Sequence, residues 1–278
     1  MRRLTLLALF TACFAASACG QSAGAREDPP APAVAPDTEA PAQAPAEAPL
    51  APETEALLDR MDEAGAKIGT LRSRFDYELN QTLYEDVQKR QGDLVFRAPN
   101  LLRFEFTDAP RETFIFDGRM LYHKKDGMRQ LVLWEVRRPD EPPVDSFELG
   151  KTPFPMPFGQ KKEAVLKHFD VREDKAAEAK DPAGRRVLVL IPKPNTPLAD
   201  SYTEIALWVD HETYLPTRAR LGDSSENITT IDFHHIETGA KADPKTFERP
   251  EVPADWEIIE HAKEPAATAQ SETEPKPQ

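Results

Sequence analysis

The feature that most constrains this fold is a change in hydrophobic periodicity after Leu71. Apolar residues recur at helical spacing from Leu57 to Leu71, behind Pro52 and Glu53, which predicts a helix at the start of the folded part. From Phe75 to Trp134, apolar and polar residues alternate in short runs instead. A period of two places alternate side chains on opposite faces of a sheet. This region is therefore predicted to be a sheet with one apolar face.

Turn signals such as Asp117-Gly118 and Asp126-Gly127 separate the alternating runs and indicate antiparallel hairpins. The first block of predicted strands covers residues 75–79, 93–97, 102–106, 114–116, 120–124 and 130–134. The second block covers residues 169–173, 185–191, 202–209, 215–221 and 227–236, with 256–259 as a further candidate. A Pro-rich segment and a predicted helix, Lys161–His168, lie between the blocks. The pattern predicts an α+β fold, mostly antiparallel β, whose large sheet curls over its helices.

The N-terminus has the three parts of a bacterial-type export signal. Arg2 and Arg3 precede the apolar run Leu4–Ala18, which is shorter than the ~20 residues of a membrane span. Three processing sites fit: after Ala18 by the small-x-small rule, at Cys19 as a lipobox, and after Ala25. The lipobox is preferred and predicts an acylated Cys19. An Asp directly after the acylated Cys would resemble an inner-membrane retention signal, but this chain has Gly20 there. We therefore expect a periplasmic domain anchored to the outer membrane.

Composition divides the chain into four segments. These are a signal peptide (1–18), a Pro/Ala-rich tether (19–52), a folded domain (53–262) and a disordered tail (263–278). Segments dominated by Ala, Pro and Glu bury too little apolar surface to offset their ordering entropy. The chain has two cysteines, Cys13 and Cys19, both within or next to the signal. The domain is therefore predicted to lack disulfides and thiolate metal sites.

The formal net charge of −13 becomes two units more negative when Arg2 and Arg3 leave with the signal. Such an acidic chain is a poor candidate for binding nucleic acid or an anionic lipid surface by charge. We read the charge as a source of solubility and expect no nucleic-acid partner.

The sequence carries no recognisable catalytic motif, such as G-x-S-x-G, a phosphate-binding glycine loop or H-E-x-x-H. Asp210-His211-Glu212 is read as a solvated turn rather than a metal site. His234 and His235 are neighbours on a strand, so their side chains are expected on opposite faces. We therefore expect no catalytic residue, no metal site and no cofactor, and we do not expect an enzyme.

The apolar face of the first block is unusually aromatic. These side chains either form an ordinary core under the helices or line a space that holds an apolar ligand, as strongly curved sheets do. The candidate cavity residues are Phe75, Tyr77, Leu94, Phe96, Phe104, Phe106, Phe114 and Phe116.

Several segments, in order, resemble the outer-membrane lipoprotein carrier protein LolA family and its LolB relatives. The likeness spans about residues 55–260. Its main pieces are Gly92–Phe96, Arg97–Phe104 with its turn proline, and the hairpin Phe116–Tyr122. Further pieces are Lys151–Phe154, Leu207–Pro216 and Asp243–Pro250.

This resemblance implies an open, incomplete β-barrel of about eleven antiparallel strands closed by a helical lid. Its apolar interior would take up lipoprotein acyl chains between an inner-membrane transporter and an outer-membrane acceptor. The lid candidates are Phe154, Met156 and Phe158, and the helix near Leu57 and Met61 would close the other side. The resemblance therefore implies a monomeric protein that binds lipoprotein acyl chains and acts in the sorting of outer-membrane lipoproteins.

Two features depart from the family pattern. LolA has an arginine directly before the turn proline that holds the lid, whereas this chain has Ala98 there and Arg97 one residue earlier. One residue along a strand moves a side chain to the opposite face, so a standard lid lock is not expected. A tethered domain also resembles the receptor LolB more than soluble LolA. The alternative function is a LolA-like sensor or protein-interaction module of the cell envelope.

Overall fold

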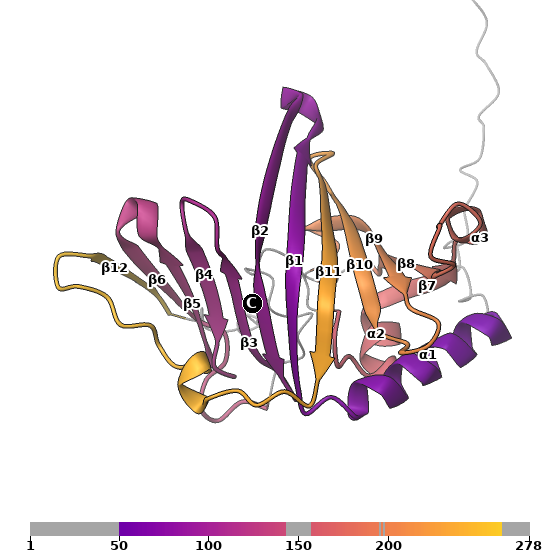
Figure 1. The fold of residues 1–278 in the computed structure, drawn as a ribbon, viewed down its shortest axis with the longest axis horizontal. Coiled ribbons are helices and arrows are strands. Elements are labelled where there is room, and N and C mark those ends of the chain that lie inside the picture. Colours follow the sequence, from indigo (N-terminus) through magenta and orange to yellow (C-terminus); the bar gives the residue numbers. More distant parts are fainter. Residues whose placement is uncertain (1–49, 143–156, 195, 197, 263–278) are drawn as a thin grey trace, which may run out of the picture. The chain divides into compact units, whose positions relative to one another are not determined.

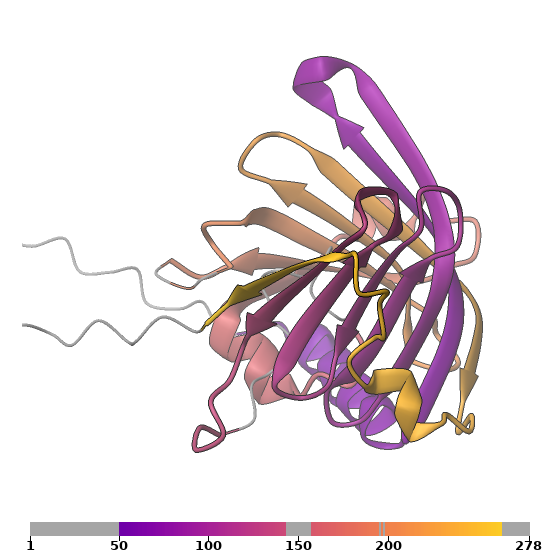
Figure 2. The ribbon, with the colours of Figure 1, turned by 90° about the vertical axis from the view of Figure 1, so that its left-hand side faces the viewer.

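Twelve strands form one sheet that curls around two helices (Figures 1 and 2). The computed structural model describes residues 50–142, 157–194, 196 and 198–262, all within one structural unit, Ala48–Gln278. Cys19, Phe154 and Met156 lie outside the described residues. The strand order is β12-β6-β5-β4-β3-β2-β1-β11-β10-β9-β8-β7, so β12 and β7 are the two edges. The predicted α+β, mostly antiparallel, open barrel is confirmed, with twelve strands instead of about eleven.

The strands follow the predicted alternating runs closely. The first block forms β1 (Thr70–Gln81), β2 (Asp86–Arg97), β3 (Leu101–Phe106), β4 (Glu112–Phe116), β5 (Met120–Lys125) and β6 (Gln130–Glu135). The second forms β7 (Phe169–Glu173), β8 (Arg186–Pro192), β9 (Tyr202–Val209), β10 (Pro216–Asp223) and β11 (Ile228–Thr238). Successive strands within each block are paired with each other, and β1 pairs with β11 to unite the blocks.

Helix α1 covers Pro52–Ala66, shorter than predicted. Proline stands in its first turn, where a missing N–H costs nothing, and Glu53 and Glu55 suit the positive end of the helix dipole. The expected continuation to Leu71 is wrong. Leu71 lies in β1 and pairs with Phe96 of β2, so its helical spacing reflects burial against the sheet. Helices α2 (Lys162–His168) and α3 (Lys175–Glu178) are short.

The two faces of the sheet carry separate apolar clusters. The concave face, on which α1 and α2 pack, holds the main core. A small second cluster lies on the convex face and consists of Ile115, Tyr122, Leu131 and Leu133. Val252, from the segment after β11, packs against it.

The C-terminal segment covers this second cluster. After the short helix η4 (Pro244–Phe247), the chain adds β12 (Glu257–His261) to the edge of β6 in parallel orientation (Figure 1). The strand predicted at 256–259 therefore exists, but it pairs in parallel. Gln130 Nε2 donates to Glu257 Oε2 at 2.6 Å, and Arg129 forms an ion pair with Asp255.

Removing residues 251–278 is expected to make the protein self-associate. The deletion uncovers the convex cluster, in which Leu131 has no exposed surface, and leaves the apolar strand β6 as an unpaired edge. Light scattering after size exclusion checks the mass. Deleting only residues 263–278 is the control and is expected to leave a monomer. A monomeric 251–278 deletion would show that the segment does not protect this edge.

An acid-sensitive contact stabilises the turn before β8. The side chain of Asp181 is 2% exposed and pairs with Arg185, with Oδ1 and Nη2 at 2.6 Å. Hydrogen bonding from Arg185 lowers the pKa of Asp181 from 3.8 to about 2. Because the folded-state pKa is depressed, this stabilisation is present above pH ~4 and is lost as the pH falls toward ~2.

Replacing Asp181 with asparagine is accordingly expected to lower the free energy of unfolding by about 1–2 kcal/mol at neutral pH. The difference from the unmodified protein should disappear near pH 2. Urea unfolding across this pH range measures it, and Asp170→Asn, at an exposed position of β7, is the control. An equal loss at both pH values would contradict an ionic origin.

Candidate functional site

The pairing register places the predicted cavity residues in rows across the concave face. One row contains Leu71, Phe96, Leu102, Phe116, Leu121 and Trp134. The next contains Ser73, Leu94, Phe104, Phe114, His123 and Val132. A third contains Phe75, Gly92, Phe106, Glu112, Lys125 and Gln130. All eight predicted cavity residues lie on this face. Its side chains become more polar from the first row to the third.

Aromatic stacking fills the middle of the concave face. The rings of Phe75 and Phe104 stack at 3.9 Å, and Phe106 meets both edge-on, at 5.6 and 5.1 Å. Phe75 occupies the space beside Gly92, where a Cβ atom would lie 2.3 Å from its ring and 2.0 Å from the Glu105 carbonyl oxygen. Glycine at this position therefore allows the stack to form.

Three polar side chains, Arg90, Glu112 and His123, lie beside the aromatic stack. Arg90, opposite Tyr77 in the register, lies 4.1 Å over the Phe106 ring and donates to Glu112 at 3.1 Å. His123 Nε2 is 2.8 Å from the other carboxylate oxygen of Glu112. Hydrogen bonding from His123 lowers the pKa of Glu112, and burial lowers the pKa of His123. At neutral pH, Glu112 is therefore ionised and a neutral His123 donates to it.

The opposite end of the concave face is closed by α1 and by residues 157–161, the described part of the loop that leads into α2. Phe158 in this loop has no exposed surface and meets Phe233 of β11 edge-on at 5.0 Å. The loop fits tightly, because a Cβ on Gly65 of α1 would lie 3.2 Å from Gly159. A Cβ on Gly159 would in turn lie 3.0 Å from the ring of Phe96. The loop is thus held between the helix and the sheet.

Lys162, at the start of α2, joins the two helices. Its Nζ lies 2.7 Å from Asp59 and 3.0 Å from Glu55, both on α1. Its backbone N–H donates to Asp62 at 3.1 Å. Hydrogen bonds to Asp59 and Glu55 raise the pKa of Lys162. The sequence analysis did not identify this latch, because α1 and α2 are about a hundred residues apart in the chain.

Arg97 takes no part in this closure. Its guanidinium donates to the carbonyl of Ala242 and lies 5.1 Å from the centre of the Phe247 ring. Both contacts belong to the C-terminal segment, whereas the adjacent Phe96 contributes to the concave core. Arg97 thus contacts the C-terminal segment, whereas Lys162 bridges α1 and α2.

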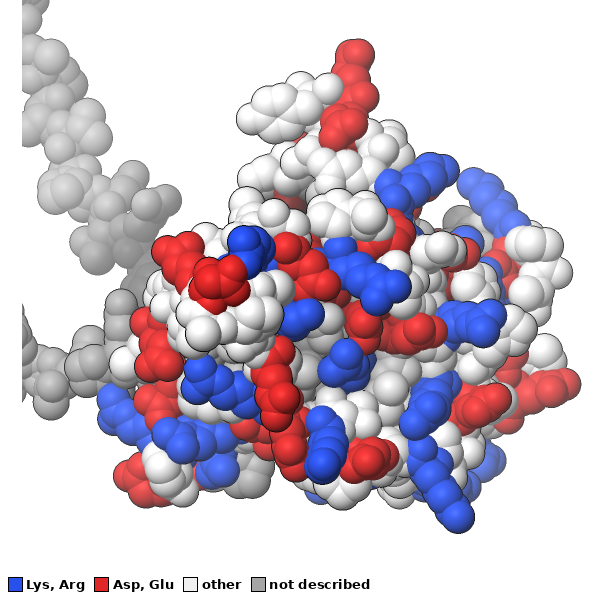
Figure 3. Space-filling model, turned by 60° about the vertical axis from the view of Figure 1, so that its left-hand side comes forward, with Lys and Arg blue, Asp and Glu red and all other residues white. Residues whose placement is uncertain are grey.

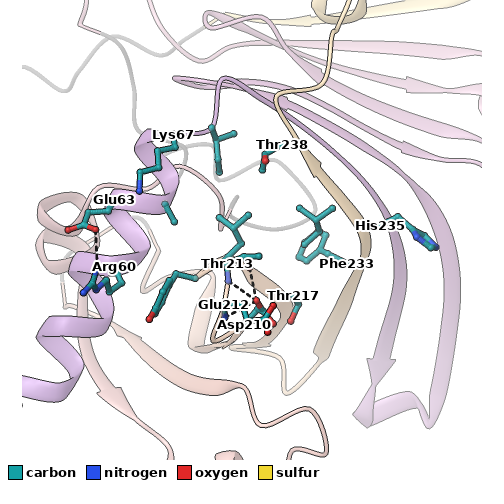
Figure 4. Close-up of a pocket in the computed structure, with 15 residues that line it drawn as sticks. Arg60, Glu63, Lys67, Asp210, Glu212, Thr213, Thr217, Phe233, His235 and Thr238 are labelled. Atoms are coloured by element: carbon teal, nitrogen blue, oxygen red, sulfur yellow. Dashed lines mark hydrogen bonds and ion pairs between the residues drawn. The ribbon is translucent and has the colours of Figure 1, made fainter.

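Hollows of different size border the described part of the concave core. A cavity between α1, the Phe158 loop and strands β8 and β9 has a volume of about 20 Å³, room for about one water molecule. A groove of about 690 Å³ lies beside α1, within the roughly 300–1,000 Å³ of ordinary ligand pockets (Figure 4). Arg60 and Glu63 line it from α1, Lys67 from just after α1, and Phe233 from β11. Phe233 also contacts the buried Phe158, so the groove borders the aromatic core.

Asp210, His211 and Glu212 lie in the turn after β9. Asp210 Oδ1 accepts from the N–H groups of Glu212 and Thr213 in an exposed turn, as predicted (Figure 4). Within the described ranges, no three His, Cys, Asp or Glu side chains are grouped so that they could hold a metal ion. Nor does any helix in this part of the chain have the length and apolarity needed to cross a membrane.

Comparison with known proteins gives a match to one family. The family described as outer membrane lipoprotein carrier protein LolA matches residues 66–250, more than half of the chain. No curated protein matches the sequence. β12 follows the matched segment and is therefore an addition to it.

Solved structures with a similar fold are distant in sequence. An uncharacterised conserved protein from Thermus thermophilus is 12% identical with a TM-score of 0.45, covering 75% of this chain and 99% of its own. The lipoprotein LppX of Mycobacterium tuberculosis is 11% identical with a TM-score of 0.38, covering 69% and 99%. The Pseudomonas aeruginosa MucA/MucB complex is 17% identical with a TM-score of 0.37, and the match covers 72% of this chain and 63% of that one. Such low scores and identities assign neither ligand nor partner to this chain.

Proposed function

The chain belongs to the outer membrane lipoprotein carrier protein LolA family, and from this premise we propose that it binds lipoprotein acyl chains on its concave face. The observation that carries the proposal is the predominantly apolar surface of the first two rows, closed by α1 and by a loop whose Phe158 is buried against Phe233. Each methylene removed from water contributes about 0.8 kcal/mol, so an acyl chain needs such a dry surface.

Binding requires the closing elements to move. A cavity of about 20 Å³ does not accept a hydrocarbon chain, whereas withdrawal of Phe158 would connect the core to the groove beside α1. In this mechanism Lys162 controls opening, because α1 and α2 separate only when its ion pairs break. The protein is proposed to act by binding and not as an enzyme.

The cellular setting follows from the N-terminus. We propose that Cys19 is acylated and anchors the protein to the outer membrane, with the domain in the periplasm. Anchored in this way, the domain would accept lipoproteins close to its own membrane during outer-membrane lipoprotein sorting. Mass measurement of the mature N-terminus tests the anchor, since an unacylated Cys19 or a start at Arg26 would contradict it.

A reversible lock tests the binding site. In an Asp59→Cys/Lys162→Cys variant, two side chains whose charged atoms lie 2.7 Å apart are replaced by thiols, and a bis-maleimide linker with an internal, reducible disulfide joins them and fixes α2 to α1. Delipidated protein is titrated with a fluorescent fatty acid and with a purified lipoprotein. The linked variant is expected to lose binding and the reduced variant to regain it, with each single-cysteine variant as control. Equal binding in both states would place the ligand elsewhere.

The packed interior also supports a second candidate. The small cavity between α1, the Phe158 loop and strands β8 and β9, about 20 Å³, is compatible with a domain that binds a protein and no lipid, as a sensor or interaction module would. Native mass spectrometry of protein purified without detergent distinguishes the two functions. Bound lipid favours acyl-chain binding, while an empty domain that binds neither fatty acid nor lipoprotein favours the module.

Replacing Lys162 with glutamine is expected to accelerate fatty-acid uptake by about two- to fivefold, the range for one exposed ion-pair contact. The variant keeps a long polar side chain but loses the charge that attracts Asp59 and Glu55. Stopped-flow fluorescence measures the rate. Lys89→Gln removes an ion pair to Glu78 on the β1–β2 hairpin, away from α1 and α2, and is the control. Unchanged uptake by Lys162→Gln would mean that α1 and α2 do not separate during binding.

A further inference from the structure

The β1–β2 hairpin extends beyond the rest of the sheet. Its twelve paired positions run from Thr70↔Arg97 to Gln81↔Asp86, but β3 pairs with β2 only between Gly92 and Arg97. Beyond Gly92, β2 therefore has no strand paired with it on that side. Figures 1 and 2 show this hairpin end projecting past the other strands.

The projecting end carries exposed apolar side chains. Leu83 is 67% exposed, Tyr84 78% and Val87 48%. In the described part of the chain, five large hydrophobic side chains are exposed, and these are three of them. Single exposed apolar residues are ordinary, but three within five residues at the tip of a projection indicate a contact surface.

The tip is held in one conformation. Glu85 closes a short 3-10 turn, Thr82–Tyr84, by donating its N–H to Thr82. The Thr82 hydroxyl donates to the Glu226 carbonyl at 2.7 Å, which ties the tip to the turn between β10 and β11. A surface that is already ordered loses little conformational entropy on binding.

The charge beside the apolar residues is negative. Glu85 and Asp86 follow Tyr84 directly, and no lysine or arginine occurs between Leu79 and Gln88. The next basic residue, Lys89, is paired with Glu78 at 3.0 Å. In Figure 3, Lys and Arg mix with Asp and Glu over the body, while the projecting end at the top is white with red beside it.

From these observations we propose that the tip of the β1–β2 hairpin docks into a partner protein, in an apolar pocket bordered by lysine or arginine. Leu83, Tyr84 and Val87 would enter the pocket, and Glu85 and Asp86 would face the basic border. A bilayer fits less well, since insertion of Leu83 and Tyr84 would bring two carboxylates into the interface and oppose anionic lipid.

Site-specific photocrosslinking tests the proposal in the full-length chain in envelopes of the source bacterium. Benzoylphenylalanine replaces Tyr84 and, as control, Met128, which is 67% exposed in another turn. We expect one discrete protein adduct from position 84 and none from position 128. Adding Glu85→Lys and Asp86→Lys should lower the yield by about tenfold or more. Charge reversal of the partner's basic border should restore it.

Several results would overturn the proposal. These are no adduct at position 84, an adduct insensitive to charge reversal, and an adduct with a second copy of the chain. Flotation with phosphatidylcholine vesicles, with and without phosphatidylglycerol, provides a further test. Vesicle binding that is lost in Leu83→Ser/Tyr84→Ser would assign the tip to a bilayer instead. Fatty-acid binding by the tip variants is expected to be unchanged, so this test is independent of the proposed function.

Discussion

Replacing Gly92 with alanine is expected to lower the free energy of unfolding by about 3 kcal/mol, the upper end for overpacking a core. In a domain of about 200 residues this corresponds to a melting temperature about 6–12 °C lower. The added methyl would lie 2.0 Å from a carbonyl oxygen of β3 and 2.3 Å from the Phe75 ring. Relief requires both a shift of the strand and displacement of Phe75 from its stack with Phe104.

Gly69→Ala is the matched control for this experiment. A Cβ at Gly69 meets nothing within 4 Å, so its substitution is expected to change stability by no more than about 0.5 kcal/mol. Thermal unfolding followed by circular dichroism measures both variants. Similar stability of the two variants would show that β2 and β3 can separate locally without disturbing the aromatic stack.

Replacing Phe158 with alanine is expected to have opposite effects on stability and on binding. Loss of a fully buried phenylalanine should destabilise the ligand-free protein by about 3–5 kcal/mol. If Phe158 is the plug that an acyl chain displaces, the variant should nevertheless bind fatty acid more tightly, because the ligand then fills the vacated space. Calorimetry gives the affinity, and thermal unfolding with and without fatty acid gives the stability.

Phe247→Ala separates this role from a purely structural one. Phe247 is 3% exposed, but it packs beside Arg97 in the C-terminal segment. Its truncation should destabilise the protein without strengthening fatty-acid binding. Unchanged or weaker binding by Phe158→Ala, as in this control, would identify Phe158 as an ordinary core residue.

Most of the sheet was predictable because its strands are half-buried. Alternation of buried and exposed residues is a local signal, and it located β7 and β9 to the residue. The same signal placed all eight aromatic and aliphatic candidates on one face. The end of α1 was less predictable, since Leu71 is buried against the sheet at a spacing that a longer helix would also give.

Features that depend on distant pairing were not predictable in the same way. β12 pairs in parallel with β6, more than a hundred residues earlier, and no local pattern specifies that partner. The latch between Lys162 and Asp59 depends on two helices that meet only after the sheet has curled. Likewise, the exposure of Leu83 and Tyr84 results from β1 and β2 being longer than their neighbours.

The sequence alone thus determined the type of fold, the apolar face and the family resemblance, because all three rest on short-range periodicity and on motifs in order along the chain. The tertiary structure decided how that face is closed. Whether a row of phenylalanines is an open cavity or a packed core depends on the volume left between sheet and helices. Here Phe158 and Gly159 occupy part of that volume, and contacts between segments far apart in the chain hold them there.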